Sequence, residues 1–242
     1  MIVGYTMLHY GKDYLAYALR SLAPYIDKHV IIYSEQPTFG SHTALPCPDT
    51  RDELKTIALD VLRDKLVWVE GMAQNYETVR TIIPYAELIL EVDADEVYEP
   101  RLVANLLRAH RQNRLIPGSH RLPMVHHWRS FDYVCRDTSW PIRMNTTTPE
   151  RTHTYQPDMT SGVIHHFGYA RALSDMRYKI ETSAHRGEWR AGWWDDVFMR
   201  YPERLTDLHP VVEGMWNAEP YDKTCLPDFM REHPNFNKVV IE

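Results

Sequence analysis

The stretch with the clearest chemical potential is residues 86–100, AELILEVDADEVYEP. Its branched apolar residues, bounded by acids and by Pro100, predict a buried strand rather than a helix. Because side chains alternate along a strand, Asp93 and Asp95 point the same way if the extended geometry continues. Two adjacent carboxylates repel each other, and Mg²⁺ or Mn²⁺ relieves that repulsion while leaving coordination positions for water and substrate phosphates. The sequence therefore predicts a metal site at Asp93 and Asp95, and the alternative is a solvated acidic turn.

The N-terminal residues predict the elements that position this site. Residues 1–10 indicate a first strand, Asp13 is expected to cap a helix, and residues 30–33 indicate a second strand. Short connections of this kind favour a βαβ start with parallel pairing. Ligands of such sheets bind beyond the carboxyl ends of the strands. His9 and Tyr10, at the end of the first strand, are therefore expected near a nucleotide pocket.

The remaining periodicity predicts further helices and strands. Residues 36–52 and 146–157 read as loops, and little periodicity is left beyond residue 185. The runs 122–129 and 139–144 are β-like and predict an antiparallel extension of the sheet. The expected helices are 51–64, 75–83, 102–110 and 169–185, and the other expected strand is 65–69.

Composition sets limits on the class of protein. The chain has 242 residues, 44% of them hydrophobic and 25% charged, which is ordinary for a globular protein. Three widely spaced cysteines without a CxxC pair favour a reducing compartment over a disulfide framework. No stretch is long and apolar enough for a membrane span, so we expect a cytoplasmic protein without a membrane partner. The net charge of −6 is unusual for a binder of nucleic-acid backbones.

Three segments together resemble a known family. VDADEVY resembles the DxD motif of GT-A fold glycosyltransferases, in particular their family 2-like branch, and the first 35 residues are similar to that family's first strand, helix and second strand. VIHHFGYAR resembles the H-aromatic-G-aromatic segment that carries a third metal ligand. The resemblance covers residues 1–100 and, more loosely, 140–180. It implies an α/β fold with a Rossmann-like mixed central sheet flanked by helices and an irregular C-terminal extension.

The resemblance also implies roles for individual residues. One of His165 and His166 would be the third metal ligand, and His166 is favoured because it precedes the aromatic-Gly pair. Lys179 would contact the donor phosphates. Arg80 would face the nucleotide, and the end of the first strand, at His9 and Tyr10, would contact the base. The single domain 1–242 would have a nucleotide-sugar-binding half, 1–100, and an acceptor-binding half, 101–242.

Transfer with inversion requires a carboxylate that takes the proton of the acceptor hydroxyl. The candidates are Asp158, Glu181, Asp195 and Asp196. The pair Asp195 and Asp196 is favoured because it lies among aromatic residues in WWDDVF. The alternative reading is that both acids only cap a helix.

The function expected from these features is metal-dependent transfer of a sugar from a nucleotide-sugar donor, with UDP-sugars favoured, to a hydroxyl acceptor. The acceptor is open: a saccharide, a protein, or a hydroxymethylated base in phage DNA, in which case the enzyme would work in the host cytoplasm. Seven arginines between positions 108 and 143 suggest a basic strip for DNA, and a solvated surface explains them as well. A sugar-nucleotide nucleotidyltransferase and a non-catalytic nucleotide- or metal-binding module are the other readings, and no oligomeric state is predicted.

Two features depart from the family pattern. Glu91 occupies a strand position that is usually apolar, which suggests either an edge strand or contact with substrate. The chain also lacks a GxxxAxN helix ahead of the acidic motif.

Overall fold

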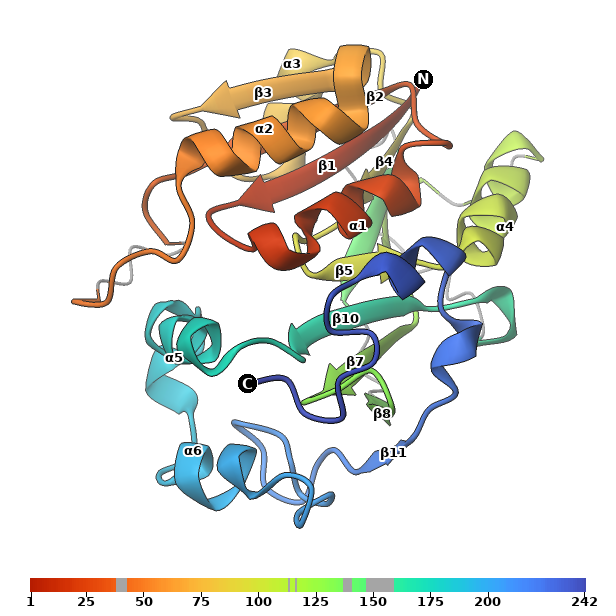
Figure 1. Cartoon of the computed structure of the whole chain (residues 1–242). Helices are drawn as coiled ribbons and strands as arrows, with labels where there is room; N and C mark the ends of the chain where they lie inside the picture. The colour runs from red at the N-terminus through yellow and green to blue at the C-terminus, as the bar shows by residue number, and fades with distance from the viewer. Residues whose placement is uncertain (38–42, 113, 116, 137–140, 147–158) are drawn as a thin grey trace. The chain divides into compact units, whose positions relative to one another are not determined.

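The computed structural model describes residues 1–37, 43–112, 114–115, 117–136, 141–146 and 159–242 (Figure 1). The chain divides into two compact units, which are described separately. Unit 1 comprises Met1–Glu35, Asp49–Met124 and Ser139–His165, and unit 2 comprises Gln36–Pro48, Val125–Thr138 and His166–Glu242. Each unit contains residues from both sides of position 100, so this division does not follow the halves 1–100 and 101–242, whose roles stay predictions.

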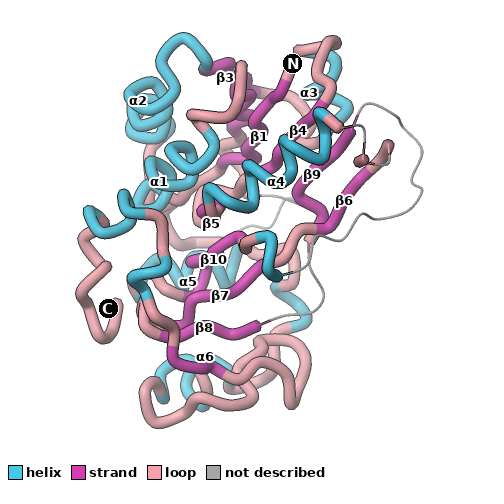
Figure 2. The backbone as a smooth tube through the Cα atoms, turned by 90° about the vertical axis from the view of Figure 1, so that its right-hand side faces the viewer, coloured by secondary structure: helices cyan, strands magenta, loops and turns pink. Residues whose placement is uncertain are grey.

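Unit 1 is built on a mixed sheet with the strand order β3-β2-β1-β4-β9-β6 (Figure 2). Strand β1 pairs in parallel with β2 on one side and with β4 on the other, and β2 pairs in parallel with β3. Strand β9 pairs antiparallel with β4, in the register Leu90 with Met144, and with β6. The bounds are β1 (Ile2–Leu8), β2 (Lys28–Tyr33), β3 (Leu66–Glu70), β4 (Leu88–Glu91), β6 (Ser119–Arg121) and β9 (Ile142–Thr146).

Alternating side chains of the central strands enter two aliphatic cores, one on each face of the sheet. Val3 and Ile89 belong to the core that includes Val79 of α3, whereas Leu8 and Leu90 belong to the larger core with α1, α2 and α4. The helices are α1 (Lys12–Leu22), α2 (Arg51–Leu62), α3 (Tyr76–Ile82) and α4 (Pro100–Arg111), with η2 (Arg63–Lys65), η3 (Met159–Ser161) and the short strand β5 (Glu96–Tyr98) between them. The predicted mixed sheet flanked by helices is confirmed.

The start of α1 differs from the prediction. Asp13 lies inside the first turn and does not cap the helix; the N-cap is Gly11, with φ 123°. The cap is a tertiary one, because the buried carboxylate of Asp49 accepts hydrogen bonds from the backbone N–H groups of Gly11 (2.6 Å) and Lys12 (2.9 Å). The sequence pattern could not reveal this contact, since Asp49 lies 38 residues away from Gly11.

Unit 2 combines a small sheet with short helices and turns. Its strands run in the order β11-β8-β7-β10, with β8 antiparallel to both β7 and β11. Its core is aromatic and includes Trp128, Tyr169, Trp193, Phe198 and Trp216. The elements are β7 (Met124–Trp128), β8 (Tyr133–Arg136), β10 (Ile164–Tyr169), α5 (Leu173–Thr182), η4 (Arg186–Glu188), α6 (Trp193–Asp196), η5 (Phe198–Arg200), β11 (Ala218–Pro220), η6 (Lys223–Cys225) and η7 (Asp228–Glu232).

The helix expected from residue 169 starts later, at Leu173, because Tyr169 is the last residue of β10. The irregular C-terminal part is confirmed by the short turns that follow α6. Thr146, the first residue of the predicted loop 146–157, is instead the last residue of β9, and the rest of that loop and the candidate base Asp158 lie outside the described residues. Among the described residues, none of the helices has the length and apolar character needed to cross a membrane.

Candidate functional site

The acidic segment forms a turn and not a continued strand. Strand β4 ends at Glu91, and the backbone N–H of Glu96 donates to the carbonyl of Asp93 (3.0 Å). The extended geometry that would align Asp93 with Asp95 is therefore interrupted. The side chain of Asp93 is 31% exposed, whereas Asp95 is buried.

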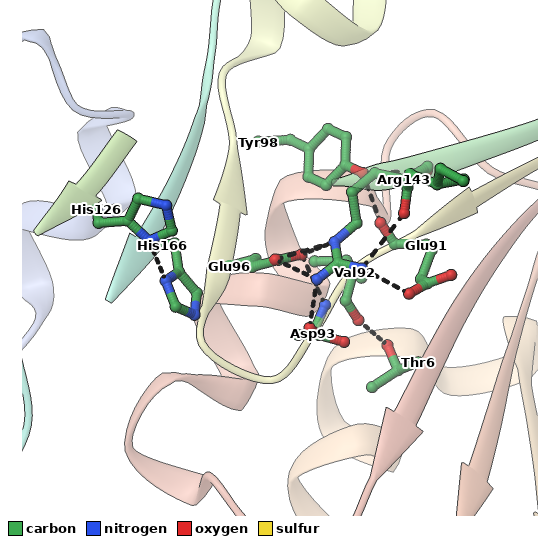
Figure 3. Close-up of polar contacts among 10 residues, drawn as sticks. Thr6, Glu91, Val92, Asp93, Glu96, Tyr98, His126, Arg143 and His166 are labelled. Carbon is green, nitrogen blue, oxygen red and sulfur yellow. Dashed lines mark hydrogen bonds and ion pairs between the residues drawn. The ribbon is translucent and has the colours of Figure 1, made fainter. Parts of the chain in front are cut away.

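Arg143 of β9 organises the acids of this turn (Figure 3). Its guanidinium donates to the carboxylates of Glu91 (2.7 Å) and Asp93 (2.6 Å), and to both oxygens of Glu96 (2.8–3.0 Å). The antiparallel pairing of β9 with β4 brings these residues together across about fifty positions of sequence. Bidentate, charge-assisted hydrogen bonds of this kind define the geometry of both partners.

Burial dominates the electrostatics of the cluster. It raises the pKa of Glu96, which is fully buried, to about 8, and it also raises the pKa of Glu91; in both cases the Arg143 guanidinium opposes the rise. The single guanidinium of Arg143 thus contacts three carboxyl groups, so the cluster contains more acidic groups than basic ones. The suggestion that Glu91 marks an edge strand is wrong, because β4 lies between β1 and β9 and Glu91 pairs with Arg143.

The acidic turn has the donor chemistry for a hard divalent cation. Within the described residues, no group of three or more histidine, cysteine, aspartate or glutamate side chains is arranged to hold a metal ion. Mg²⁺ and Mn²⁺ do not require such a group, since one or two carboxylates suffice when water and phosphates complete the shell. Asp93 fits this role because its carboxylate is partly exposed and is held by a hydrogen bond from Arg143 to Oδ2. An ionised carboxylate offers about four lone-pair sites.

The acidic turn lies against the loop that follows β1. A Cβ added to Gly11 would stand 2.8 Å from the Cβ of Ala94, so the two backbones meet at that point. The positive φ of Gly11 and this close approach both favour glycine. His9 lies in the same loop, where its Nδ1 contacts the carbonyl of Ser34 (2.9 Å) and burial lowers its pKa. Its ring meets that of Tyr10 edge-on at 5.7 Å.

A chain of buried hydrogen bonds connects the acidic turn to strands β1 and β2. The hydroxyl of Thr6 donates to the carbonyl of Val92 (2.8 Å), the residue that precedes Asp93 (Figure 3). The same hydroxyl accepts from Nε2 of His29 on β2 (2.9 Å), which assigns the ring proton to that nitrogen. Because His29 is fully buried, desolvation lowers its pKa to about 3 and keeps it neutral.

Arg80 of α3 donates hydrogen bonds to two residues of β9. Its guanidinium donates to the carbonyl of Thr146 (2.8 Å) and to the side chain of Asn145. These bonds tie the helix to the strand that carries Arg143. The expected contact of Arg80 with a nucleotide stays a prediction.

The two histidines of VIHHFGYAR have different surroundings. His165 is buried in unit 1, where its Nε2 contacts the carboxylate of Glu99 at 3.2 Å. His166 belongs to unit 2, and its Nδ1 lies 2.8 Å from Nδ1 of His126 (Figure 3). Both histidines are thus engaged by a neighbour, and the expected ligand role of His166 stays a prediction.

The other predicted site residues belong to unit 2. Lys179 of α5 lies over the ring of Tyr169 (5.3 Å) and contributes to the wall of a pocket. Asp195 and Asp196 are exposed in the four-residue helix α6. Asp196 also lines a second pocket together with Arg204, whose guanidinium donates to the Asp196 carbonyl (3.1 Å).

Sequence reasoning missed two residues of the unit 1 site. The sequence places Arg143 only among the arginines of a possible surface strip, yet three carboxylates hold its guanidinium, and Arg129 of the same strip is buried. The available signal was Glu91, because an acid within an apolar strand requires an opposite charge from a neighbouring strand. Asp49 gave no local signal.

Comparison with models of protein families gives no match, and comparison with curated proteins gives none. Among solved structures there is weak similarity to a crystal structure of residues 1–349 of S. aureus TarS, at 12% identity and a TM-score of 0.34. That match covers 52% of this chain and 35% of the other. A second S. aureus TarS structure matches at 13% identity and a TM-score of 0.33, over 51% of this chain and 21% of that one. The chain thus spans well under two thirds of the length of either matched structure.

Proposed function

We propose that this protein is a metal-dependent glycosyltransferase that moves a sugar from a nucleotide-sugar donor, with UDP-sugars favoured, to a hydroxyl acceptor. The observation that carries the proposal is the contact between the loop after β1 and the acidic turn after β4. The strand order β3-β2-β1-β4 changes direction between these two strands. Open α/β sheets bind ligands beyond the carboxyl ends of strands at such a switch point.

The start of α1 argues for a cation in this site. In dinucleotide-binding folds, a diphosphate rests on the free N–H groups of the first helix. In this protein the Asp49 carboxylate already accepts from the N–H groups of Gly11 and Lys12. A diphosphate here needs positive charge from another source, and Asp93 and Asp95 have the donor chemistry to hold Mn²⁺ or Mg²⁺.

The protein's own residues would then orient the donor. Arg143 holds the carboxylate of Asp93 in place, and His9 and Tyr10 offer ring surfaces beside it. His166 is proposed as a third ligand from the resemblance. The bound metal would stabilise the negative charge on the departing diphosphate. If the reaction inverts the anomeric centre, Asp195 or Asp196 would accept the proton of the acceptor hydroxyl.

A saccharide is the acceptor class that we favour. Burial of Arg129 and the ion pairs of Arg143 with three acids remove two of the seven arginines from the basic strip that a DNA acceptor would use. A hydroxymethylated base in phage DNA and a protein hydroxyl are the other acceptors. The remaining candidate, a non-catalytic binding module, would bind a nucleotide without turnover.

The first experiment is thermal unfolding with UDP, GDP and their common sugars, with and without Mn²⁺. Binding to the folded state stabilises it, by about 2.7 kcal/mol at a ligand concentration one hundred times Kd. We expect a Mn²⁺-dependent rise with one nucleotide, loss of that rise in Asp93→Asn, and no loss in Asp60→Asn, which alters an exposed acid of α2. UDP release in the presence of acceptor then separates an enzyme from a binding module. A nucleotide effect that is unchanged in Asp93→Asn contradicts the proposed site.

A further inference from the structure

The peptide unit that joins Val92 to Asp93 lies where the chain leaves the sheet and enters the acidic turn. The ladder between β1 and β4 ends with the pair Tyr5 and Glu91. Beyond that pair, the N–H of Val92 donates to the carbonyl of Tyr5 (2.8 Å), and the carbonyl of Val92 accepts from the hydroxyl of Thr6 (2.8 Å; Figure 3). A side chain of β1 therefore holds the backbone at the point where the ladder stops.

This hydrogen bond fixes the backbone of Asp93 as well as that of Val92. A trans peptide unit is planar, so its C=O and its N–H point in opposite directions. The carbonyl of the Val92–Asp93 unit accepts from Thr6, and its N–H, which belongs to Asp93, donates to Oε2 of Glu96 (3.0 Å). The two contacts hold opposite sides of one rigid unit. That unit sets the direction in which the Asp93 side chain leaves the backbone.

The hydroxyl of Thr6 is itself held by a buried histidine. The carbonyl of Val92 can only accept, so the proton of Thr6 is directed to it, and Oγ1 of Thr6 accepts from Nε2 of His29 (2.9 Å). The imidazole fits there because the residue that faces it on β1 is Gly4. A Cβ on Gly4 would stand 2.3 Å from Nδ1 of His29. Gly4, Thr6 and His29 thus form one buried polar arrangement.

The stability of the sheet does not explain this histidine. Nδ1 of His29 is buried and has no hydrogen-bond partner among the described residues, and an unsatisfied buried acceptor destabilises the folded state. Burial also lowers the pKa of His29 to about 3, so the neutral ring adds no ion pair. An apolar side chain would avoid the cost. The feature that only a polar side chain supplies is the hydrogen bond to Thr6.

We propose that Thr6, held by His29, is a positioning residue for the metal and diphosphate site at Asp93. This step rests on the function proposed above. The hydroxyl keeps the Val92–Asp93 unit in one orientation, so the turn needs no rearrangement when a cation binds. Without the hydroxyl the unit is free to rotate, and the carboxylate of Asp93 is presented less precisely. Groups that orient a ligand in this way typically change metal affinity by about 10–100-fold when they are lost.

The test uses the full chain with matched variants. Thr6→Val keeps nearly the same shape and removes the hydroxyl, whereas Thr6→Ser retains the hydroxyl. The control is Thr182→Val, because Thr182 is also buried and its hydroxyl also donates to a backbone carbonyl at 2.8 Å, that of Tyr178 in α5. His29→Leu removes the group that holds Thr6 while leaving the threonine in place.

The first measurement needs no metal. Hydrogen exchange followed by NMR reports on the backbone N–H groups of Asp93 and Glu96, which both donate within the turn. In Thr6→Val we expect both to exchange about fivefold faster relative to the amides of β3, the factor that corresponds to one typical hydrogen bond. Thr6→Ser and Thr182→Val should exchange in the turn as the wild-type protein does. His29→Leu should give a smaller increase in the same direction.

The second measurement is the affinity for Mn²⁺ in the presence of UDP, from the electron paramagnetic resonance signal of the free ion. Thr6→Val should weaken Mn²⁺ binding about tenfold. Thr6→Ser should restore it, and Thr182→Val should bind Mn²⁺ as the wild-type protein does. A general loss of stability would instead affect Thr6→Val and Thr182→Val alike.

Wild-type exchange in the turn of folded Thr6→Val overturns the proposal, and so does wild-type Mn²⁺ affinity in that variant. If Thr6→Val does not fold, the same two readings on His29→Leu decide. Failure of the proposed function gives a different result. No Mn²⁺ binding by the wild-type protein rejects the function and this step together. Mn²⁺ binding that is lost in Asp93→Asn but unchanged in Thr6→Val keeps the function and rejects this step alone.

Discussion

In unit 1 the core is aliphatic and the charged residues of the site lie on β9, at the end of β4 and in the turn after it, whereas in unit 2 the core is aromatic and the pocket lined by Lys179 lies among short turns. The acids of unit 1 are held by Arg143 through five hydrogen bonds within 3.0 Å. The lining residues of unit 2 are held by ring contacts and backbone hydrogen bonds. The difference indicates that ion pairs set the side-chain geometry of the acidic site in unit 1. Packing of aromatic rings sets the geometry of the pocket in unit 2.

The largest expected effect follows from removing the charge of Arg143. Arg143→Met leaves Glu91, Asp93 and Glu96 without their cation, and breaking a buried pair costs about 3–5 kcal/mol. Denaturant unfolding should show this loss. Arg136→Met is the control, because its ion pair with Glu219 is exposed and such pairs contribute about 0–1 kcal/mol. Similar losses in both variants would show that charge balance does not distinguish unit 1.

A smaller effect is expected in the aromatic core. Trp193→Phe removes the indole N–H that donates to the carbonyl of Leu208 (2.9 Å), and a buried carbonyl left unsatisfied costs about 1–3 kcal/mol. Scanning calorimetry measures the change, and Trp194→Phe, a half-buried neighbour, is the comparison. A greater loss in Trp194→Phe would contradict the proposed importance of the Trp193 contact.

The buried histidine of unit 1 predicts a dependence of stability on pH. The pKa of His29 is about 3 in the folded state, below its ordinary value of 6.5. Between these two values the unfolded chain takes up a proton that the folded state does not. The free energy of unfolding should therefore fall as the pH is lowered through this window, by up to about 1.4 kcal/mol per pH unit from this group. His29→Leu should reduce the slope measured by denaturant unfolding between pH 7 and pH 4, and equal slopes would rule the histidine out.

The smallest expected effect concerns helix capping, which differs between α2 of unit 1 and the helices of unit 2. Helix α2 has a capping box between Thr50 and Glu53, whereas α5 and α6 have no side-chain cap. Thr50→Ala should cost about 1 kcal/mol. Ser174→Ala in the first turn of α5 removes no cap and should change the melting temperature little. Equal shifts in the two variants would indicate that the box contributes nothing.

The difference between the two cores also explains how much of the fold and of the site could be predicted from the sequence. Most strands and helices of unit 1 followed from apolar periodicity, whereas the short strands β5 and β6 were not predicted. The acidic segment was also recognised. The role of Arg143 was not, because it depends on the pairing of β4 with β9, which local patterns do not specify. In unit 2 a few large rings at irregular spacing fill the core, so there was little periodicity to interpret.

The arrangement around Arg143 has a consequence for the evolution of this protein. The arginine is separated from Glu91, Asp93 and Glu96 by 52, 50 and 47 positions, yet its loss alone would leave all three acids without their cation. Buried ion pairs can be replaced by apolar residues only when all partners change together. In relatives of this chain we therefore expect these four positions to covary, with the charged set either kept whole or lost whole.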